Sequence, residues 1–486
     1  MQFYSYIFIL LFLPICISGY FLLGRAEKYE ASKIWLIGMS IWFYAHLHVA
    51  YLVLLSGGVL VNYVIVYWMR RQKKPIYKKL LLLSSLTVNL GVLFFYKYYN
   101  FFVDNINFLF KSRISLLTLL LPLGLSFIVF QQISFSVDCY RNDDLQYSFI
   151  DYALYVTFFP KIVSGPIIAF EELLGQLQET ERKKVNFENM SKGFYQVAMG
   201  LAKKILIADT LAQIVAVGVS GVMELHTFSA LIVMLCYSLQ LYYDFSGYSD
   251  MAIGVARMMN IDLPVNFNSP YKARSVTEFW KRWHITLTQF FTKYVYIPLG
   301  GNRKGVRRTC INIMIVFFLS GLWHGANWTF IVWGCLHGVF MVLERLTGRK
   351  IEKIPVLGWL FTFLFANVAW VIFRSDSLSE ALLFLSRIFH IGNEGIENGL
   401  VQAMNEIVEV RILCRFGMQG IVDRIPYLPL VLFVALLLFV TLTVKNTQER
   451  VKQFCFSRKQ MAATVVLLFW SIISFSGVSV FLYSNF

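Results

Sequence analysis

The sequence has too few charged residues to cover the surface of a soluble protein of its length. Only 15% of its 486 residues are charged, whereas 57% are hydrophobic. A soluble domain has about 25% charged residues. The runs 3–23, 81–103 and 462–482 each contain the roughly 20 mostly apolar residues that cross a bilayer. The composition therefore excludes a soluble enzyme and predicts an all-α integral membrane protein.

The sequence also lacks the local signatures of most soluble enzymes. Its seven cysteines are scattered without a C-x-x-C pair, so we predict neither a disulfide framework nor a metal site. The G-x-S-x-G, P-loop, H-E-x-x-H and H-x-x-x-x-D motifs are missing. Nucleic-acid signatures are missing as well, so the net charge of +16 does not indicate nucleic-acid binding. Any chemistry is therefore expected within the membrane segments.

The basic residues gather in short clusters between the apolar runs. Residues 70–79 contain six Lys or Arg and no acid, and residues 270–308 contain nine against a single acid, Glu278. Residues 375–427 have the opposite balance, with seven acids against four Arg. Cytoplasmic loops of membrane proteins collect Lys and Arg. The pattern predicts about twelve spans, with 270–308 inside the cell and both termini and 375–427 outside.

One apolar segment, residues 152–170, is unsuited to a straight span. Pro160, Gly165 and Pro166 interrupt it. Proline removes a helical hydrogen bond, and irregular backbone at membrane depth survives only where protein or a cavity surrounds it. We therefore expect a broken or re-entrant helix here, enclosed by the other spans.

His324 is the first candidate for chemistry, because ionisable residues inside a membrane are costly. It lies near the middle of an apolar run, with Gly321 and Gly325 four residues apart. Small residues at that spacing let helices approach closely, so His324 is expected to face protein. Burial disfavours the charged ring and leaves a neutral base. Asn327, about one helical turn later, is expected on the same face. A purely structural histidine remains an equal alternative.

A second histidine, His284, lies in the basic segment. In a single helix Trp280, His284 and Leu287 would form one apolar stripe, with Lys281 and Arg282 away from it. This pattern predicts a basic amphipathic helix on the inner leaflet that points His284 into the protein. His337, by contrast, is interpreted as packing.

Two acids, Asp244 and Asp250, lie in the otherwise apolar run 242–250. They could line a polar tunnel or pair with basic residues, and pairing is the favoured interpretation. Two membrane-embedded histidines indicate proton handling at a buried centre, which serves either group transfer or transport.

The motifs together resemble the membrane-bound O-acyltransferase family, and most closely its branch of alginate O-acetyltransferase subunit I and peptidoglycan O-acetylation proteins. The residues that carry the resemblance are Phe159-Pro160 to Gly165-Pro166, Tyr243 to Asp250, Phe279 to His284, Tyr296 to Arg303 and Leu322 to Gly325. The resemblance implies a single polytopic domain, 1–486, with the family core at about 90–375, an outer segment at 375–427 and C-terminal spans at 428–486.

The resemblance also implies a fold and a site. The fold is a ring of tilted, re-entrant and interfacial helices around a central tunnel. His324 corresponds to the invariant histidine of the family and His284 to a second functional one, so both are predicted to be catalytic. Side chains predicted to line the tunnel or to bind substrate are Trp280, Arg282, Asp244, Asp250, Trp323 and Asn327.

The implied reaction moves an acetyl group from a cytoplasmic donor, acetyl-CoA, for O-acetylation of an extracytoplasmic polysaccharide at a bacterial inner membrane. Besides membrane lipid, the expected partners are an outer SGNH, esterase-like acetyltransferase that docks on 375–427 and an acyl carrier protein; no bound cofactor is expected. Two alternatives are D-alanyl transfer from a carrier protein to teichoic acid and proton-coupled transport. The run 296–303 favours the alginate-like branch, and no internal repeat of the kind found in transporters is present.

Overall fold

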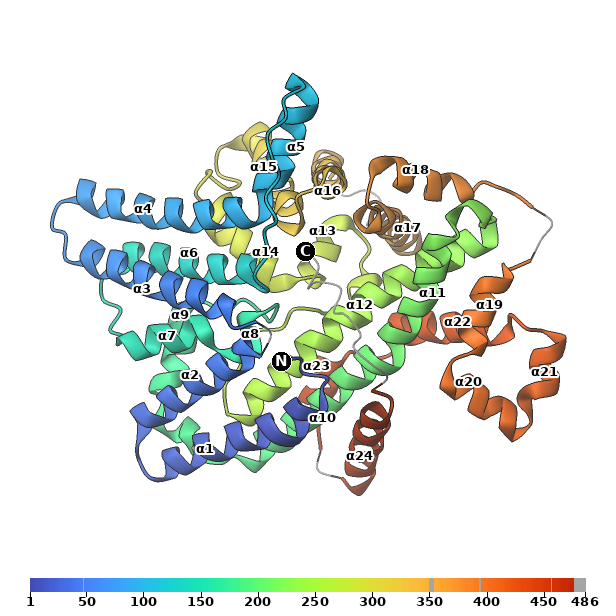
Figure 1. Cartoon of the computed structure of the whole chain (residues 1–486), viewed down its shortest axis with the longest axis horizontal. Coiled ribbons are helices and arrows are strands. Elements are labelled where there is room, and N and C mark those ends of the chain that lie inside the picture. Colours follow the sequence, from blue (N-terminus) through green and yellow to red (C-terminus); the bar gives the residue numbers. More distant parts are fainter. Residues whose placement is uncertain (47, 349–353, 393–394, 456, 476–486) are drawn as a thin grey trace.

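A computed structural model describes residues 1–46, 48–348, 354–392, 395–455 and 457–475. In these ranges every regular element is a helix, which confirms the all-α prediction. The helices follow one another in four groups around a long central helix, α12 (Thr227–Met258) (Figure 1).

The first group forms one flank of the molecule, drawn in blue and teal in Figure 1. α1 packs on α2, α3 packs on α4, and α6 packs on both α3 and α4. A π-helical turn, Phe94–Tyr98, joins α4 to α5. The helices are α1 (Leu13–Arg25), α2 (Tyr29–Ala45), α3 (Ala50–Arg70), α4 (Pro75–Leu93), α5 (Tyr99–Phe110), α6 (Leu125–Arg141) and α7 (Phe149–Thr157).

The segment 152–170 is broken, as its prolines and glycine predict. α7 ends at Thr157, α8 covers only Phe159–Ile162, and α9 (Phe170–Gln178) begins after seven residues without helix. Gly165 lies so close to α8 that an added Cβ would stand 2.4 Å from the Lys161 Cα. The non-helical stretch is largely buried inside the protein, which is where such backbone is tolerated.

The second group consists of α10 (Phe187–Leu201), α11 (Asp209–Ser220) and α12, which runs diagonally across Figure 1. Gly193 and Gly200 of α10 face Gly254 and Gly247 of α12. A Cβ on Gly247 would stand 2.8 Å from the Gly200 carbonyl oxygen. This spacing brings the two backbones together and buries α12 along most of its length.

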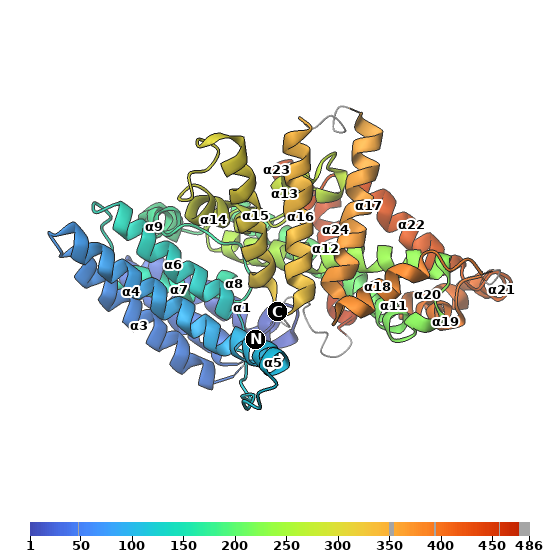
Figure 2. The same cartoon turned by 90° about the horizontal axis from the view of Figure 1, so that it is seen from above.

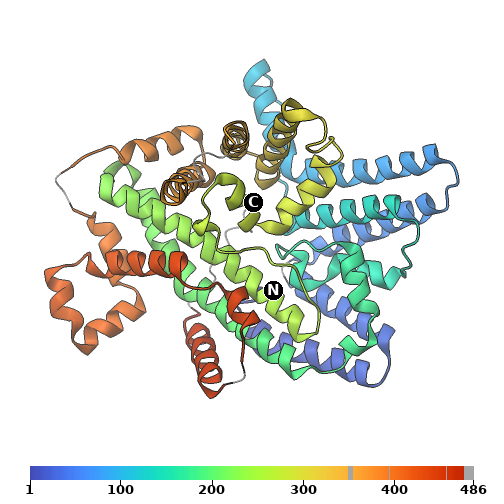
Figure 3. The same ribbon diagram turned by 180° about the vertical axis from the view of Figure 1, so that it is seen from behind.

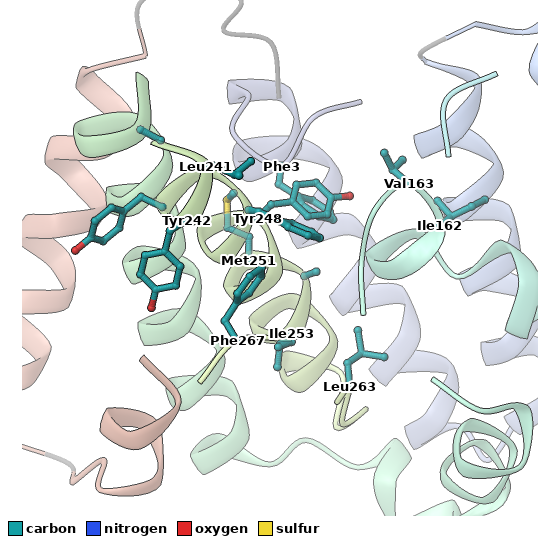
Figure 4. Close-up of a cluster of buried hydrophobic side chains, with 14 of the residues drawn as sticks. Phe3, Ile162, Val163, Leu241, Tyr242, Tyr248, Met251, Ile253, Leu263 and Phe267 are labelled. Carbon is teal, nitrogen blue, oxygen red and sulfur yellow. The ribbon is translucent and has the colours of Figure 1, made fainter. Parts of the chain in front are cut away.

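The buried side chains around α12 form the core of the molecule (Figure 4). Tyr248 of α12 stacks beside Phe3 from the N-terminus, with ring centroids 5.1 Å apart. Ile162 and Val163 bring the broken segment into the same cluster. The core therefore connects the beginning of the chain, the broken segment and α12.

The third group contains the motifs around His284 and His324. Its helices are α13 (Val276–Arg282), α14 (Ile285–Phe291), α15 (Gly305–His324), α16 (Trp328–Leu346) and α17 (Pro355–Arg374). α15, α16 and α17 stand side by side (Figure 2). The short α13 and α14 lie near the centre of the molecule in the view from behind (Figure 3).

The fourth group, drawn in orange and red, lies beside α11 and α12 (Figure 1). It comprises α18 (Leu378–Arg387), α19 (Asn398–Asn405), α20 (Val408–Leu413), α21 (Gln419–Arg424), α22 (Leu428–Thr443), α23 (Thr447–Lys452) and α24 (Arg458–Ile473). The last predicted span, 462–482, lies partly outside the described residues, which end at 475.

Seven helical stretches in the described ranges are long and apolar enough to cross a membrane. An eighth span exists if 408–424 and 428–443, which meet at a bend of 104°, are taken as one. This number is below the predicted twelve; α2 and α6, which are not among these stretches, have 17 residues each, at the lower limit of the roughly 17–25 residues that cross a bilayer. The chain is thus a multi-pass membrane protein, with spans that vary in length.

Close contact between α15 and α16 depends on their glycines. A Cβ on Gly334 would stand 2.3 Å from the Phe317 carbonyl oxygen, and one on Gly321 would stand 2.3 Å from that of Phe330. This confirms the predicted role of small residues. Gly334→Ala is therefore expected to destabilise the protein by about 1–3 kcal/mol through overpacking. Thermal unfolding of the detergent-purified protein measures the change.

The matched control for Gly334→Ala is Gly57→Ala in α3, where an added Cβ meets no atom within 4 Å. That change should leave the melting temperature equal or higher, because alanine favours the helix. A Gly334→Ala protein that melts with the wild type would show that α15 and α16 are not held as closely as described.

Candidate active site

His324 is the last residue of α15, and its ring is enclosed by aromatic side chains. The residue is 2% exposed. Its ring centroid lies 4.8 Å from Trp323, 5.0 Å from Trp333 and 5.2 Å from Phe373. The prediction that His324 faces protein is therefore confirmed, and the residue ends the first of the two helices in its apolar run.

Asn327 is not on the same helix face as His324, so that expectation was wrong. The chain leaves the helix after His324, and Asn327 caps the start of α16 by accepting a hydrogen bond from the Thr329 amide at 3.0 Å. Its amide nitrogen donates to the Asp376 carbonyl at 2.8 Å. Asparagine competes for backbone hydrogen bonds and favours such caps. These two contacts fix the start of α16.

His284 lies between α13 and α14, with a left-handed φ of 43°. The expectation of one continuous amphipathic helix through Trp280, His284 and Leu287 was therefore wrong. Asn266 provides the physical reason, because its backbone oxygen accepts from the Ile285 amide at 3.0 Å and its side-chain oxygen accepts from the Thr286 hydroxyl at 2.9 Å. These bonds replace the helical ones. The predicted burial of Trp280, His284 and Leu287 nevertheless holds.

The same asparagine orients the His284 ring. Asn266 Oδ1 also accepts from the Thr286 amide at 3.3 Å, which identifies this atom as the oxygen. Its contact of 3.1 Å with His284 Nδ1 therefore requires a hydrogen on Nδ1. Burial lowers the pKa of His284 to about 3, so the ring is neutral and its lone pair is on Nε2.

Trp323 brings the two histidines into one site. Its ring centroid lies 6.0 Å from that of His284 and 4.8 Å from that of His324. His324 and Trp323 also line a narrow pocket with residues from the π-helical turn Phe94–Tyr98, the start of α6 and the residues before it, and the broken segment. The other residues of this pocket are Lys97, Leu121, Pro122, Leu123, Gly124, Leu125, Ser126, Phe127, Val163 and Ser164.

Trp280 and Arg282 do not line this pocket. Trp280 donates its indole hydrogen to His337 Nδ1 at 3.1 Å, and its ring lies 5.6 Å from Trp333. It thus belongs to the aromatic layer behind His324, and His337 packs in that layer as predicted. Arg282 forms an ion pair with Glu278 at 2.7 Å, one turn earlier in α13.

Asp244 and Asp250 are each paired with a lysine. Lys204 contacts Asp244 at 2.9 Å and Asp209 at 2.8 Å, and Lys203 contacts Asp250 at 2.7 Å. Neither aspartate lines the His324 pocket; Asp244 lines a separate, larger cavity between α11, α12, α20 and α24. The arrangement matches the favoured interpretation of structural pairing.

Sequence reasoning missed two lysines near the site. Lys97 lies beside His324, and the buried Lys161 donates to Gln131 Oε1 at 2.7 Å with its ammonium 3.9 Å from the Tyr155 ring centre. Both are single basic residues within largely apolar runs. Because an ionisable side chain inside a membrane is energetically costly, this pattern could have marked them as candidates. No group of three or more His, Cys, Asp or Glu in the described ranges could hold a metal ion.

Comparison with known proteins identifies the family. Residues 78–376 match the family described as MBOAT, membrane-bound O-acyltransferase family. The chain is 36% identical to a peptidoglycan O-acetyltransferase of Helicobacter pylori, over 99% of this chain and 96% of that protein. It is 39% identical to a probable alginate O-acetylase of Pseudomonas putida, over 81% of each chain.

A teichoic acid D-alanyltransferase of Bacillus subtilis is 27% identical over 52% of this chain and 68% of its own length. All three similarities agree with the family indicated by the motifs around His284 and His324. The chain is an acyltransferase and belongs to the membrane-bound O-acyltransferase family.

Proposed function

We propose that this enzyme transfers acetyl groups from acetyl-CoA, supplied from the cytoplasm, for O-acetylation of an extracytoplasmic polysaccharide at a bacterial inner membrane. The observation that carries the proposal is its similarity to a peptidoglycan O-acetyltransferase over 99% of the chain. The probable alginate O-acetylases agree with it, because alginate and peptidoglycan are both polysaccharides outside the cytoplasm.

His324 would act as the general base. It lines the pocket and is surrounded by aromatic rings that exclude water, so its neutral form can take the proton of an acceptor hydroxyl. General base catalysis contributes about 10²–10⁴-fold to a rate. His284 would position the donor thioester or relay a proton, because its Nε2 carries the lone pair and its ring lies one indole away from His324.

The donor would approach from the side of the basic segment 270–308. Exposed guanidinium and ammonium groups there attract the phosphates of coenzyme A or an acidic carrier protein. The exposed basic residues are Arg274, Lys281, Lys293, Arg303, Lys304, Arg307 and Arg308. A tunnel through a ring of about twelve spans, with shorter helices such as α2 and α6 included, would connect this side to the His324 pocket.

An outer partner would complete the reaction. We propose that an SGNH, esterase-like acetyltransferase docks on residues 375–427, whose short helices lie at the edge of the molecule (Figure 1). Several large apolar side chains are exposed there, including Leu382, Phe389 and Phe416. Co-purification tests this docking, and failure with every neighbouring secreted hydrolase-like protein would count against it.

D-alanyl transfer is the second candidate, because the teichoic acid D-alanyltransferases share part of the chain. It ranks lower because their identity is 27% and covers about half of this chain. Membership of an acyltransferase family favours either form of transfer over proton-coupled transport.

Incubation of the purified protein with radiolabelled acetyl-CoA tests the proposed reaction. We expect the wild type to release free coenzyme A or to transfer label, and His324→Ala to lose both. A D-alanyl carrier-protein thioester, supplied in parallel, distinguishes the two donors. Faster turnover of that thioester, with acetyl-CoA left intact, would overturn the acetyl proposal.

A further inference from the structure

Lys97 reaches the His324 pocket from a bend in a membrane span. It lies in the π-helical turn Phe94–Tyr98 that joins α4 to α5, and π-turns of this kind are frequent at functional sites. Its ammonium donates to the carbonyl oxygens of Trp323 at 2.6 Å and His324 at 3.1 Å, and to the Ser126 hydroxyl at 3.4 Å. Lys97 therefore contacts the backbone of two of the residues that line the pocket.

The contacts of Lys97 suit an ammonium group, which has three hydrogens to donate. Two of them are donated to the Trp323 and His324 carbonyl oxygens at 2.6 and 3.1 Å. The third makes only the long contact of 3.4 Å with Ser126, so this hydrogen can turn to an acyl oxygen in the pocket. The carbonyls belong to the C-terminal end of α15, where the helix dipole favours a cation. The helix end and these contacts favour the positively charged form of Lys97 at the pocket.

That charge is not matched by a carboxylate within the described residues. The buried Lys33 and Lys204 and the half-buried Lys203 each form an ion pair with an aspartate at 2.7–2.9 Å, whereas the buried Lys161 and Lys183 donate to neutral oxygens. Lys97 contacts only neutral oxygens and the Trp323 ring, 5.9 Å away. A cation that lines a pocket in this way is suited to bind an anion that forms only during the reaction.

Ser126 adds a second donor to the same wall. It is 8% exposed and lies in the first turn of α6, two residues after Gly124. Because Lys97 donates to the Ser126 oxygen, the serine hydrogen points to a different acceptor, and the lysine charge strengthens it as a donor. The positive end of the α6 dipole faces the pocket through Leu125 to Phe127.

We propose that the Lys97 ammonium and the Ser126 hydroxyl bind the carbonyl oxygen of the acyl group in the His324 pocket and stabilise the oxyanion that forms on it. This inference rests on the proposed acetyl transfer and names the groups that hold the carbonyl oxygen while His324 takes the proton.

Acetyl transfer in this pocket proceeds by addition to the thioester carbonyl, followed by loss of the thiolate. The acceptor hydroxyl attacks the thioester carbonyl carbon, a carbon–oxygen bond forms, and His324 takes the hydroxyl proton. The electron pair of the carbonyl moves to its oxygen, where Lys97 and Ser126 hold the negative charge. The carbonyl then re-forms, the carbon–sulfur bond breaks, and the leaving thiolate takes the proton from His324.

Lys97→Met and Ser126→Ala test the assignment, with acetyl transfer measured per folded protein. Loss of one oxyanion donor costs about 10²–10³-fold in kcat. We expect a loss in this range for Lys97→Met and at least about tenfold for Ser126→Ala, with the KM for acetyl-CoA changed less than about threefold. Lys97→Arg and Ser126→Thr keep the donors and should recover part of the rate. Lys79→Met, an exposed lysine of α4, is the matched control.

A merely structural role for Lys97 predicts a different result. If the lysine only caps α15, Lys97→Met lowers the melting temperature and leaves kcat per folded molecule within about threefold of the wild type. That outcome, or an unchanged kcat in Ser126→Ala, would overturn the proposal, and Ser126→Ala decides it should Lys97→Met not fold. Absence of transfer in the wild type would instead contradict the proposed acetyl reaction itself.

Discussion

Replacement of His324 by alanine is expected to lower acetyl transfer by about 10²–10⁴-fold, the range that a general base contributes. The ring lines the pocket, is 2% exposed and lies within 5 Å of Trp323 and Trp333. No bulk water can replace it as a base in that enclosure. Release of coenzyme A from acetyl-CoA, followed over time with the purified protein, measures the loss. His324→Gln should be similarly impaired, because an amide cannot accept the proton at neutral pH.

The matched control for His324 is His337→Gln. His337 is equally buried among Trp280, Trp333 and Phe365, but it only accepts the indole hydrogen of Trp280. Glutamine keeps an acceptor, so this variant should retain transfer within about tenfold of wild type, since a lost neutral hydrogen bond costs about 1 kcal/mol. If His324→Ala retains as much activity as His337→Gln, His324 is a packing residue and the base lies elsewhere.

Replacement of Lys204 by methionine is expected to destabilise the protein by about 3–5 kcal/mol, because it leaves buried carboxylates without their cation. The Lys204 side chain is 2% exposed and joins Asp244 of α12 to Asp209 of α11. Thermal or denaturant unfolding in detergent measures the loss. Rescue is expected when Asp244→Asn and Asp209→Asn are added to Lys204→Met, since these changes remove the uncompensated charges.

Lys192→Met in α10 serves as the control for Lys204→Met. Lys192 pairs with Glu188, whose side chain is 59% exposed. Exposed pairs contribute about 0–1 kcal/mol, so the control should unfold almost with the wild type. Equal stability of the Lys204→Met and Lys192→Met proteins would show that the triad around Lys204 does not hold α11 and α12 together.

The features of the architecture that depend on composition and periodicity were predicted from the sequence. The apolar runs predicted a helical membrane protein, and Pro160, Gly165 and Pro166 predicted the broken segment at 152–170. The four-residue glycine spacing in α15 and α16 predicted their close contact. These features are local properties of the chain, so they can be read without knowledge of distant contacts.

The predictions that were wrong concern features that depend on contacts between distant segments. The stripe of Trp280, His284 and Leu287 has helical spacing, but Asn266, 18 residues before His284, supplies the bonds that end α13 and reverse the chain at that histidine. Asn327 has helical spacing from His324, yet it caps α16. Spacing alone cannot distinguish a continuous helix from two helices joined at a polar residue.

The candidate site was predicted only in part. Both histidines and Trp323 come together as the resemblance implied, and the roles of His284 and His324 remain predictions. Lys97 was missed because 226 residues separate it from Trp323, and the aromatic run around it resembles an ordinary span. The sequence predicted that Asp244 and Asp250 pair with basic residues. It did not show which ones, and the structure identifies Lys204 and Lys203.

The most direct test of acyl transfer across the membrane uses inside-out vesicles from cells that express the protein. Radiolabelled acetyl-CoA is supplied outside, on the side expected to expose residues 270–308, while the polysaccharide is enclosed. We predict that acetyl label accumulates in enclosed polysaccharide, that free coenzyme A stays outside, and that His324→Ala vesicles show neither. Label that reaches the polysaccharide only when the donor is enclosed with it, or equally in His324→Ala vesicles, would contradict the account.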